Sequence, residues 1–111
     1  GVRCVIDIHK SVKVPKGDAA THLYRIAREA VGNAVKHGQS RNIWIRLRIK
    51  DSHRAELKIE SDGQRFSKPA RSKGLGLHIM RSRAAMLNAL LEITPGSKEG
   101  TVVSCIFPIS I

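Results

Sequence analysis

The spacing of apolar residues divides the chain into helix-like and strand-like stretches. Apolar residues at helical spacing run from Leu23 to Ala34, which predicts an amphipathic helix that begins at Asp18 or Thr21 and stops at Gly38. Three- and four-residue steps later in the chain predict a second helix, with its apolar positions at Leu77, Met80, Ala84, Leu87 and Leu91. Both helices need an apolar surface to cover.

Alternation of apolar and polar residues predicts the strands. We expect one strand near residues 2–9, a hairpin of residues 43–49 and 55–60, and two final strands at 91–94 and 101–107. One face of each strand must cover a core. The order of elements therefore predicts an α+β fold: a two-layer α/β sandwich with helices on one face of a mixed, mostly antiparallel sheet.

The length of 111 residues predicts a single domain, residues 1–111, with one modest core. No window approaches the ~18 consecutive apolar residues of a membrane span, and the opening "GVRCVIDIHK" lacks the pattern of a secretory signal. We therefore expect a cytoplasmic domain without membrane contact. Cys4 and Cys105 lie in apolar, strand-like runs, where a buried reduced thiol is the expected state.

The chain is strongly basic, with 20 Lys plus Arg against 9 Asp plus Glu and a net charge of +11. Such a charge favours phosphate-bearing or polyanionic partners. The basic residues are spread through every segment, and only four aromatic side chains are available for stacking on bases. Direct nucleic-acid binding is therefore not expected, although a basic nucleic-acid-binding domain stays open as an alternative.

The first predicted helix carries three polar residues on one flank of its apolar stripe. Glu29, Asn33 and Lys36 fall within roughly 60° of each other at ~100° per residue, so they could converge on one ligand. Asn33 and the preceding Gly32 are both poor helix formers, which suggests a role other than helix stability. The alternative is an exposed network of side chains worth only tenths of a kcal/mol.

Two glycines, Gly74 and Gly76, stand where a loop enters the second predicted helix in "SKGLGLHIMRSRAAM". A glycine-rich helix entrance lets backbone N–H groups approach a phosphate closely at the positive end of the helix dipole. On its own this pattern is weak, and a flexible loop before a helix explains it equally well. The pattern gains weight because it occurs together with the polar flank of the first helix.

Together these residues resemble the ATP-binding domain of bacterial sensor histidine kinases, which shares the Bergerat (GHKL) fold with gyrase, Hsp90 and MutL. "LYRIAREAVGNAVKHG" is similar to the N box of that family, and "ESDGQRF" stands at its aspartate-glycine box. "GLGLHIMRSRAAML" resembles its second glycine box, and "EGTVVSCIFP" its closing Gly-Thr strand. The run "MRSRAAMLNALLEI" is most similar to the nitrate-sensor type of kinase. The resemblance covers nearly the whole chain.

The resemblance implies ATP and Mg²⁺ as cofactors and gives roles to residues of the first helix. Asn33 would help to hold Mg²⁺ against the triphosphate, since an amide oxygen suits a hard cation. Lys36 and His37 would face phosphate oxygens. Glu29 matches a catalytic acidic residue that orients water in hydrolysing relatives, and in a kinase it would support the metal site.

The resemblance also implies the remaining nucleotide contacts. Gly74, Gly76 and Leu77 would form the lid and the helix entrance at the phosphates, and Thr101 would back the adenine pocket. Three further binding residues come from the aspartate-glycine box, and these are Ser61, Asp62 and Gly63.

The aspartate-glycine box departs from the Asp-x-Gly-x-Gly pattern of the family. Alignment on Gly63 puts Ser61 at the aspartate that accepts a hydrogen bond from the adenine amino group, and Arg65 at the second glycine. Asp62 could replace that aspartate only if the turn were shifted by one residue, because neighbours on a strand point to opposite faces. Arg65 lacks the backbone freedom of glycine, so the resemblance implies a weakened adenine pocket.

The function implied is that of the catalytic domain of a histidine kinase, which presents ATP·Mg²⁺ for transfer to a histidine in a separate dimerisation domain. A response regulator would then receive the phosphoryl group in two-component signalling. None of the five histidines lies in a separate dimerisation helix, so we expect the chain to be a fragment with little activity of its own. A degenerate, nucleotide-free module that acts in protein interaction is the alternative.

Overall fold

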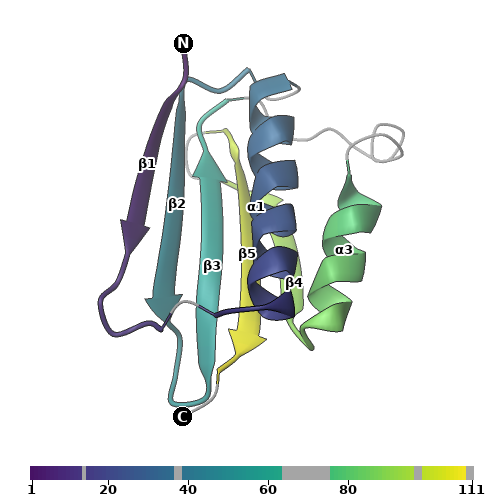
Figure 1. Cartoon of the computed structure of the whole chain (residues 1–111). Coiled ribbons are helices and arrows are strands. Elements are labelled where there is room, and N and C mark those ends of the chain that lie inside the picture. The colour runs from purple at the N-terminus through teal and green to yellow at the C-terminus, as the bar shows by residue number, and fades with distance from the viewer. Residues whose placement is uncertain (14, 37–38, 64–75, 97–98, 110–111) are drawn as a thin grey trace.

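The computed structural model describes residues 1–13, 15–36, 39–63, 76–96 and 99–109, which form two helices and one five-stranded sheet. Figure 1 shows both helices on the same face of the sheet. In chain order the elements are β1 (Arg3–Ile8), α1 (Asp18–Lys36), β2 (Asn42–Ile49), β3 (Arg54–Ser61), α3 (Leu77–Met86), β4 (Leu90–Pro95) and β5 (Thr101–Pro108). The predicted two-layer α+β sandwich is confirmed.

The sheet is mixed, as predicted, and its strands lie in the order β1-β2-β3-β5-β4. Strand β1 pairs with β2 in parallel, whereas the other three pairings are antiparallel. Parallel neighbours need a long crossover connection, and α1 forms that connection between β1 and β2. The tight hairpin of β2 and β3 needs no such element, and neither does the pair of β4 and β5.

The core lies between the helices and the central strands. In β3 every second residue is buried on the face that the helices cover, β2 buries Ile43 and Leu47 on that face, and β5 is buried along most of its length. The largest fully buried side chains come from both layers, and they are Phe107, Ile26, Ile43, Ile59, Met80 and Cys105. This single core confirms the expectation that one face of the central strands covers apolar side chains.

Helix α1 begins at Asp18 and ends at Lys36, which confirms the first of its two predicted starts. The acidic residue in the first turn and the basic residue in the last turn both interact favourably with the helix dipole. Its buried residues include Leu23, Ile26 and Ala30, on the face that packs on the sheet. None of the helices that the structure describes is long and apolar enough to cross a lipid bilayer.

The predicted helical position of Leu91 was wrong. Helix α3 ends at Met86, Asn88 adopts a left-handed conformation with φ 54°, and β4 begins at Leu90. Leu91 therefore pairs with Cys105 in the sheet and packs against the core from a strand. Its helical spacing arose by coincidence, because a leucine at either kind of position can face the same core.

Strand β1 differs from the expectation that every strand covers a core. All six of its residues are exposed, and Ile6 is 65% exposed. The strand lies at the edge of the sheet beyond α1 (Figure 1), so neither helix covers it. The predicted burial of Cys4 was wrong for this reason, since its thiol is exposed.

The prediction for Cys105 is confirmed, since its thiol is free and buried. Burial disfavours the charged thiolate and raises the pKa of Cys105 to about 11. The thiol therefore stays protonated near neutral pH and contributes as a small apolar group of the core.

Packing of α1 on the sheet predicts the effect of truncating Ile26, which is 0% exposed. We expect Ile26→Ala to lower the free energy of unfolding by about 2–5 kcal/mol, because it leaves a cavity in the core. Ile79→Ala is the matched control, since Ile79 lies on a helix and is 42% exposed. In urea denaturation, Ile79→Ala should lower the free energy of unfolding by no more than about 1 kcal/mol. Equal losses of stability for the two variants would contradict the described core.

Candidate functional site

The predicted site residues that the structure describes lie at one end of the sandwich. Helix α1 ends there, α3 begins there, β3 ends there, and β5 starts there, at the top of Figure 1. This arrangement brings together four segments that are far apart in the sequence. Three of the buried polar residues come from these segments, namely Asn33, Ser61 and Thr101.

Ser61 and Thr101 face each other across β3 and β5. The Oγ of Ser61 lies 3.4 Å from both the carbonyl oxygen and the backbone nitrogen of Thr101, so it can donate to one and accept from the other. Both side chains lie on the sheet face that the helices cover, because the register continues from Ile59 and Val103. The structure therefore brings two predicted site residues into contact.

Gly100 allows this close approach of the two strands. A Cβ atom at this position would overlap the carbonyl group of Ser61 and lie 2.9 Å from the Cα of Asp62. These are backbone atoms and cannot rotate away. Gly100 was not among the predicted site residues, although its place in the Gly-Thr pair was a signal that could have identified it.

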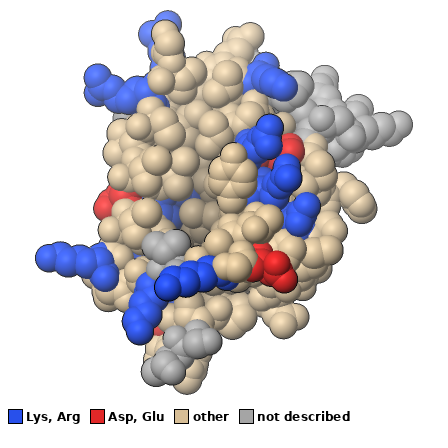
Figure 2. Space-filling model, viewed as in Figure 1, with Lys and Arg blue, Asp and Glu red and all other residues tan. Residues whose placement is uncertain are grey.

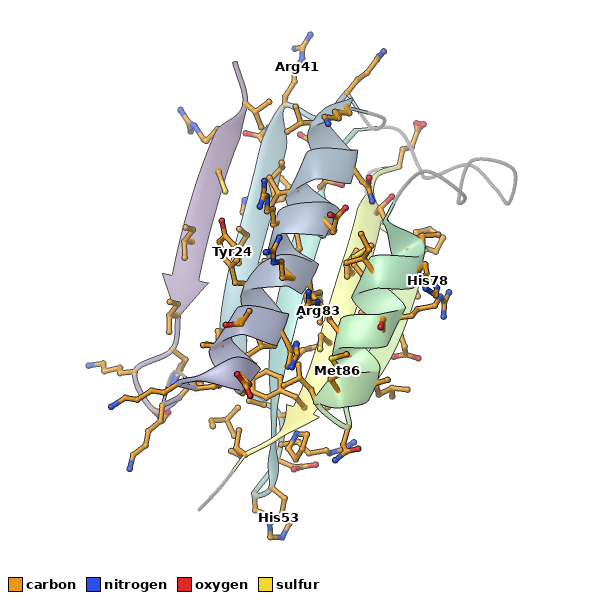
Figure 3. All side chains as sticks on the ribbon, turned by 45° about the vertical axis from the view of Figure 1, so that its right-hand side comes forward. Tyr24, Arg41, His53, His78, Arg83 and Met86 are labelled. Atoms are coloured by element: carbon orange, nitrogen blue, oxygen red, sulfur yellow. The ribbon has the colours of Figure 1, made fainter. Side chains whose placement is uncertain are left out.

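Asp62 points away from Ser61, and its carboxylate accepts three hydrogen bonds. Its carboxylate accepts from the backbone N–H groups of Arg41 and Asn42 at 3.0 Å, and from the Asn42 side-chain amide at 2.8 Å. Arg41 is labelled at this end of the molecule in Figure 3. These three bonds turn the Asp62 carboxylate to the start of β2, so in this structure Asp62 fastens the end of β3 to that strand.

These hydrogen bonds also shift the titration of Asp62. The bond from the Asn42 side chain, with those from the backbone N–H groups of Asn42 and Arg41, holds the pKa of the carboxyl below its ordinary value of 3.8. Donors favour the charged form of a carboxyl, and partial burial opposes them. Asp62 therefore remains a carboxylate throughout the neutral range.

Glu29 on α1 lies against Gly76 at the start of α3. A Cβ atom on Gly76 would overlap the Glu29 carboxylate and lie 2.8 Å from its Cδ atom. Gly76 also has a φ of 72°, a left-handed conformation that costs other residues free energy. The structure thus brings the acid of the first motif to the glycine of the second.

Asn33 is 5% exposed on α1, one turn after Glu29, whereas Lys36 is exposed in the last turn. Within the described part of the chain, no ion pair joins Glu29 to Lys36. The burial of Asn33 argues against the alternative of a wholly exposed side-chain network. A buried amide on a helix face needs polar partners, because burial without them costs free energy.

The first turn of α3 has no side-chain cap, and its N-cap residue is Gly76. Leu77, the next residue, packs against the core with its side chain half-buried. Arg83 holds α3 to α1 through a contact of 3.2 Å between its Nη1 and the Nδ1 of His22, and Figure 3 shows Arg83 between the two helices. The helix entrance is therefore positioned by packing and not by a cap.

Two predicted binding residues, His37 and Gly74, lie outside the described residues, as does Arg65. Gly63 is described and half-buried, directly after Asp62. Within the described ranges, no group of three or more His, Cys, Asp or Glu side chains gathers as a metal site.

Comparison with known proteins identifies the family. Residues 18–111 match the family described as "Histidine kinase-, DNA gyrase B-, and HSP90-like ATPase". The chain belongs to this family. The match includes α1 and every element after it, so the predicted resemblance is confirmed, and only β1 and the connector that follows it lie outside the matched residues.

Relatives of this ATPase-family domain include sensor proteins. It is 38% identical over 88 residues to the "Sensor protein NarQ homolog" of Haemophilus influenzae, covering 78% of this chain and 16% of that protein. It is 30% identical over 118 residues to the "Sensor protein VraS" of Staphylococcus aureus, covering 96% of this chain and 33% of that protein. The chain thus spans between 16% and 33% of the length of these relatives.

Solved structures agree with the fold. The histidine kinase domain of the Erythrobacter litoralis EL346 blue-light activated histidine kinase matches with a TM-score of 0.76 and 25% identity, over 97% of this chain and 55% of that one. The ATP binding domain of PrrB from Mycobacterium tuberculosis matches with a TM-score of 0.77 over 99% of this chain and 82% of that one. At 17% identity, the second likeness shows the fold alone.

The close approach at Gly100 gives a prediction for this ATPase-family domain. We expect Gly100→Ala to lower the free energy of unfolding by about 2 kcal/mol or more, because the added methyl group overlaps backbone atoms. Gly32→Ala is the control, since a Cβ there meets no atom within 4 Å. In the middle of α1 it should stabilise by up to about 1 kcal/mol. A tolerated Gly100→Ala would show that β3 and β5 are not this close.

The hydrogen bonds of Asp62 give a prediction of pH dependence. Because the folded-state pKa of Asp62 lies below its ordinary value of 3.8, its stabilisation is complete above that value and is lost as the pH falls through the folded-state pKa. At about pH 7 we expect Asp62→Asn to unfold with its midpoint at a lower urea concentration than the unaltered chain. The difference between the two midpoints should become smaller below about pH 4.

The control for this experiment is Asp7→Asn, which changes an exposed carboxylate that makes no hydrogen bond or ion pair with the described residues. It should leave the unfolding midpoint nearly unchanged at both pH values. A gap between Asp62→Asn and the unaltered chain that stays constant with pH would contradict the assigned bonds.

Proposed function

We propose that this domain binds ATP with Mg²⁺ and, within a longer protein-histidine kinase, presents the nucleotide for phosphoryl transfer to a histidine. The family match and the sensor relatives support this proposal. The observation that carries it is the set of buried polar residues Asn33, Ser61 and Thr101, which come from segments that meet at one end of an otherwise apolar layer. A few polar side chains that converge at one end of an apolar layer are typical of a ligand-binding site.

In this proposal Asn33 offers its amide oxygen to Mg²⁺, and Lys36 with His37 faces the phosphates. The Mg²⁺ ion, when bound, neutralises charge on the triphosphate and holds it in position for transfer. Glu29 supports the metal site from beside Gly76, which fits their close contact. Gly74, Gly76 and Leu77 form the phosphate-facing helix entrance. Transfer would then depend on orientation and electrostatics.

The base would lie against the end of β3 and the start of β5, where Ser61, Gly63 and Thr101 form its pocket. Asp62 stays outside this set, because its carboxylate holds Arg41 and Asn42. Ser61 lacks the charge of the aspartate found in the family pattern, so we expect weaker binding than in a site with that acid. A lost hydrogen bond to a charged acceptor costs about 1.5–3 kcal/mol.

The partners in this proposal are a dimerisation and phosphoacceptor domain of the same protein and a response regulator. We place the protein's catalytic part in the cytoplasm, where ATP is available. Figure 2 shows Lys and Arg at several separate places on this face of the domain and not in one continuous patch. The distribution on the face shown therefore gives no support to nucleic-acid binding through that face.

Calorimetric titration with a non-hydrolysable ATP analogue, with and without Mg²⁺, tests the proposal. We expect Mg²⁺-dependent binding, and Asn33→Ala should weaken it by about 10-fold or more, since even groups that only orient metal ligands contribute 10- to 100-fold to metal affinity. Circular dichroism would check that the variant is folded. His53→Ala, at the opposite end of the molecule (Figure 3), should bind as the unaltered chain does.

Two outcomes would count against this function. Absence of binding to the unaltered chain, but binding to a variant with Ser61→Asp and Arg65→Gly, would indicate a degenerate module that keeps the fold alone. Binding that Asn33→Ala leaves unchanged would remove Asn33 from the metal site.

A further inference from the structure

On the face of β3 and β5 that the helices cover, the opposed residue pairs change from apolar to polar at the site. Successive opposed pairs are apolar, and they are Ala55 with Phe107, Leu57 with Cys105, and Ile59 with Val103. The next position along the ladder holds Ser61 and Thr101, both about 95% buried. The row of apolar pairs therefore ends at Ser61 and Thr101. Ser61 is the polar residue of β3 at the edge where the proposed nucleotide base would lie.

The hydroxyl of Ser61 is held loosely. Its oxygen lies 3.4 Å from the carbonyl oxygen and 3.4 Å from the nitrogen of Thr101. Both distances exceed the usual ranges of about 2.5–3.0 Å for O–H···O and 2.7–3.2 Å for N–H···O bonds. Neither bond is strong enough to fix the hydroxyl proton in one direction.

The Ser61 hydroxyl can bond to a ligand in two ways, as an acceptor or as a donor. If Ser61 donates its proton to the carbonyl of Thr101, its lone pair can accept a hydrogen bond from a ligand N–H group. If the hydroxyl turns its proton to a ligand oxygen, it keeps only the bond that it accepts from the N–H group of Thr101. The first arrangement keeps both bonds to Thr101, so the two arrangements differ by the one long O–H···O bond of 3.4 Å, which is weak.

A carboxylate at the position of Ser61 would not have this choice, because an ionised acid only accepts hydrogen bonds and repels a ligand oxygen. The neighbouring carboxylate, Asp62, cannot supply the missing selectivity. Three donors from Arg41 and Asn42 hold it on the far side of the turn, and its pKa lies below the ordinary value. Among the described side chains, neither Ser61 nor Thr101, which form this pocket edge, is an acceptor only.

We propose that Ser61 makes this site indifferent to the substituent at position 6 of the purine, so that a 6-oxopurine nucleoside triphosphate binds about as tightly as ATP. The inference rests on the proposed function, which places the base at this edge. The 6-amino group of adenine donates a hydrogen bond, whereas the 6-oxo group accepts one, and Ser61 can serve either. Sites that do discriminate leave a buried polar group unpaired with the wrong ligand, and Ser61 avoids this.

The test compares ATP with inosine triphosphate, which carries a 6-oxo group and no 2-amino group, by calorimetric titration in the presence of Mg²⁺. We expect the dissociation constants for the unaltered chain to agree within about fivefold, the effect of roughly one ordinary hydrogen bond. Ser61→Asp should shift the ratio in favour of ATP by about tenfold or more, because the carboxylate repels the 6-oxo group.

Two further variants complete the test. Ser61→Ala removes the hydroxyl and should weaken both nucleotides by the same factor. Ser104→Ala is the matched control, because Ser104 lies on β5 at the open face of the sheet, where its hydroxyl donates to Glu56. It should change neither dissociation constant. The ratio for the unaltered chain decides the question even if Ser61→Asp does not fold.

The results distinguish failure of the role given to Ser61 from failure of the proposed function. ATP binding with a preference of about 50-fold or more over inosine triphosphate would overturn the role of Ser61 and leave the proposed function intact. Failure of both nucleotides to bind would overturn the proposed function, and the inference with it. The unaltered chain could bind both nucleotides with similar dissociation constants while Ser61→Ala weakens the binding of ATP alone. That result would also overturn the inference that Ser61 bonds to both nucleotides.

Discussion

Burial of one face of α1 against the central strands is the interaction on which the other features of the domain depend. Ile26 of the helix and Ile43 and Ile59 of the sheet lose nearly all contact with water. Each such side chain contributes about 1.5–3 kcal/mol through the hydrophobic effect. The same helix carries Glu29 and Asn33 on its flank, so the packing that stabilises the domain also fixes where these polar groups lie.

The site is organised by backbone proximity at the end of the sheet. Gly100 lets β5 approach the turn after β3, Ser61 contacts the backbone of Thr101, and Asp62 fastens the same turn to β2. Two neighbouring residues thus serve two different strands, because successive side chains on a strand point in opposite directions. A serine in place of an acid then changes the chemistry offered to a ligand without changing the way the strands are held.

Much of the fold was predictable from local pattern. The span of α1, the hairpin of β2 and β3 and the two final strands follow from helical and alternating periodicity. Leu91 and Cys4 were the failures, since a single leucine fits both periods and the exposure of β1 depends on where α1 lies. Among the site residues, Gly76 and Thr101 could be chosen from motif spacing, whereas the role of Gly100 required knowledge of its neighbours.

The sequence by itself determined the order of helices and strands and the family to which the chain belongs, because both are written in residue type and short-range spacing. The tertiary structure alone decided that Glu29 lies against Gly76, that Ser61 faces Thr101, and that Asp62 turns to Asn42. These contacts join residues separated by 20 to 47 positions, as the pairs Asn42 with Asp62 and Glu29 with Gly76 show. Their geometry depends on strand register and helix packing, and no local pattern encodes either.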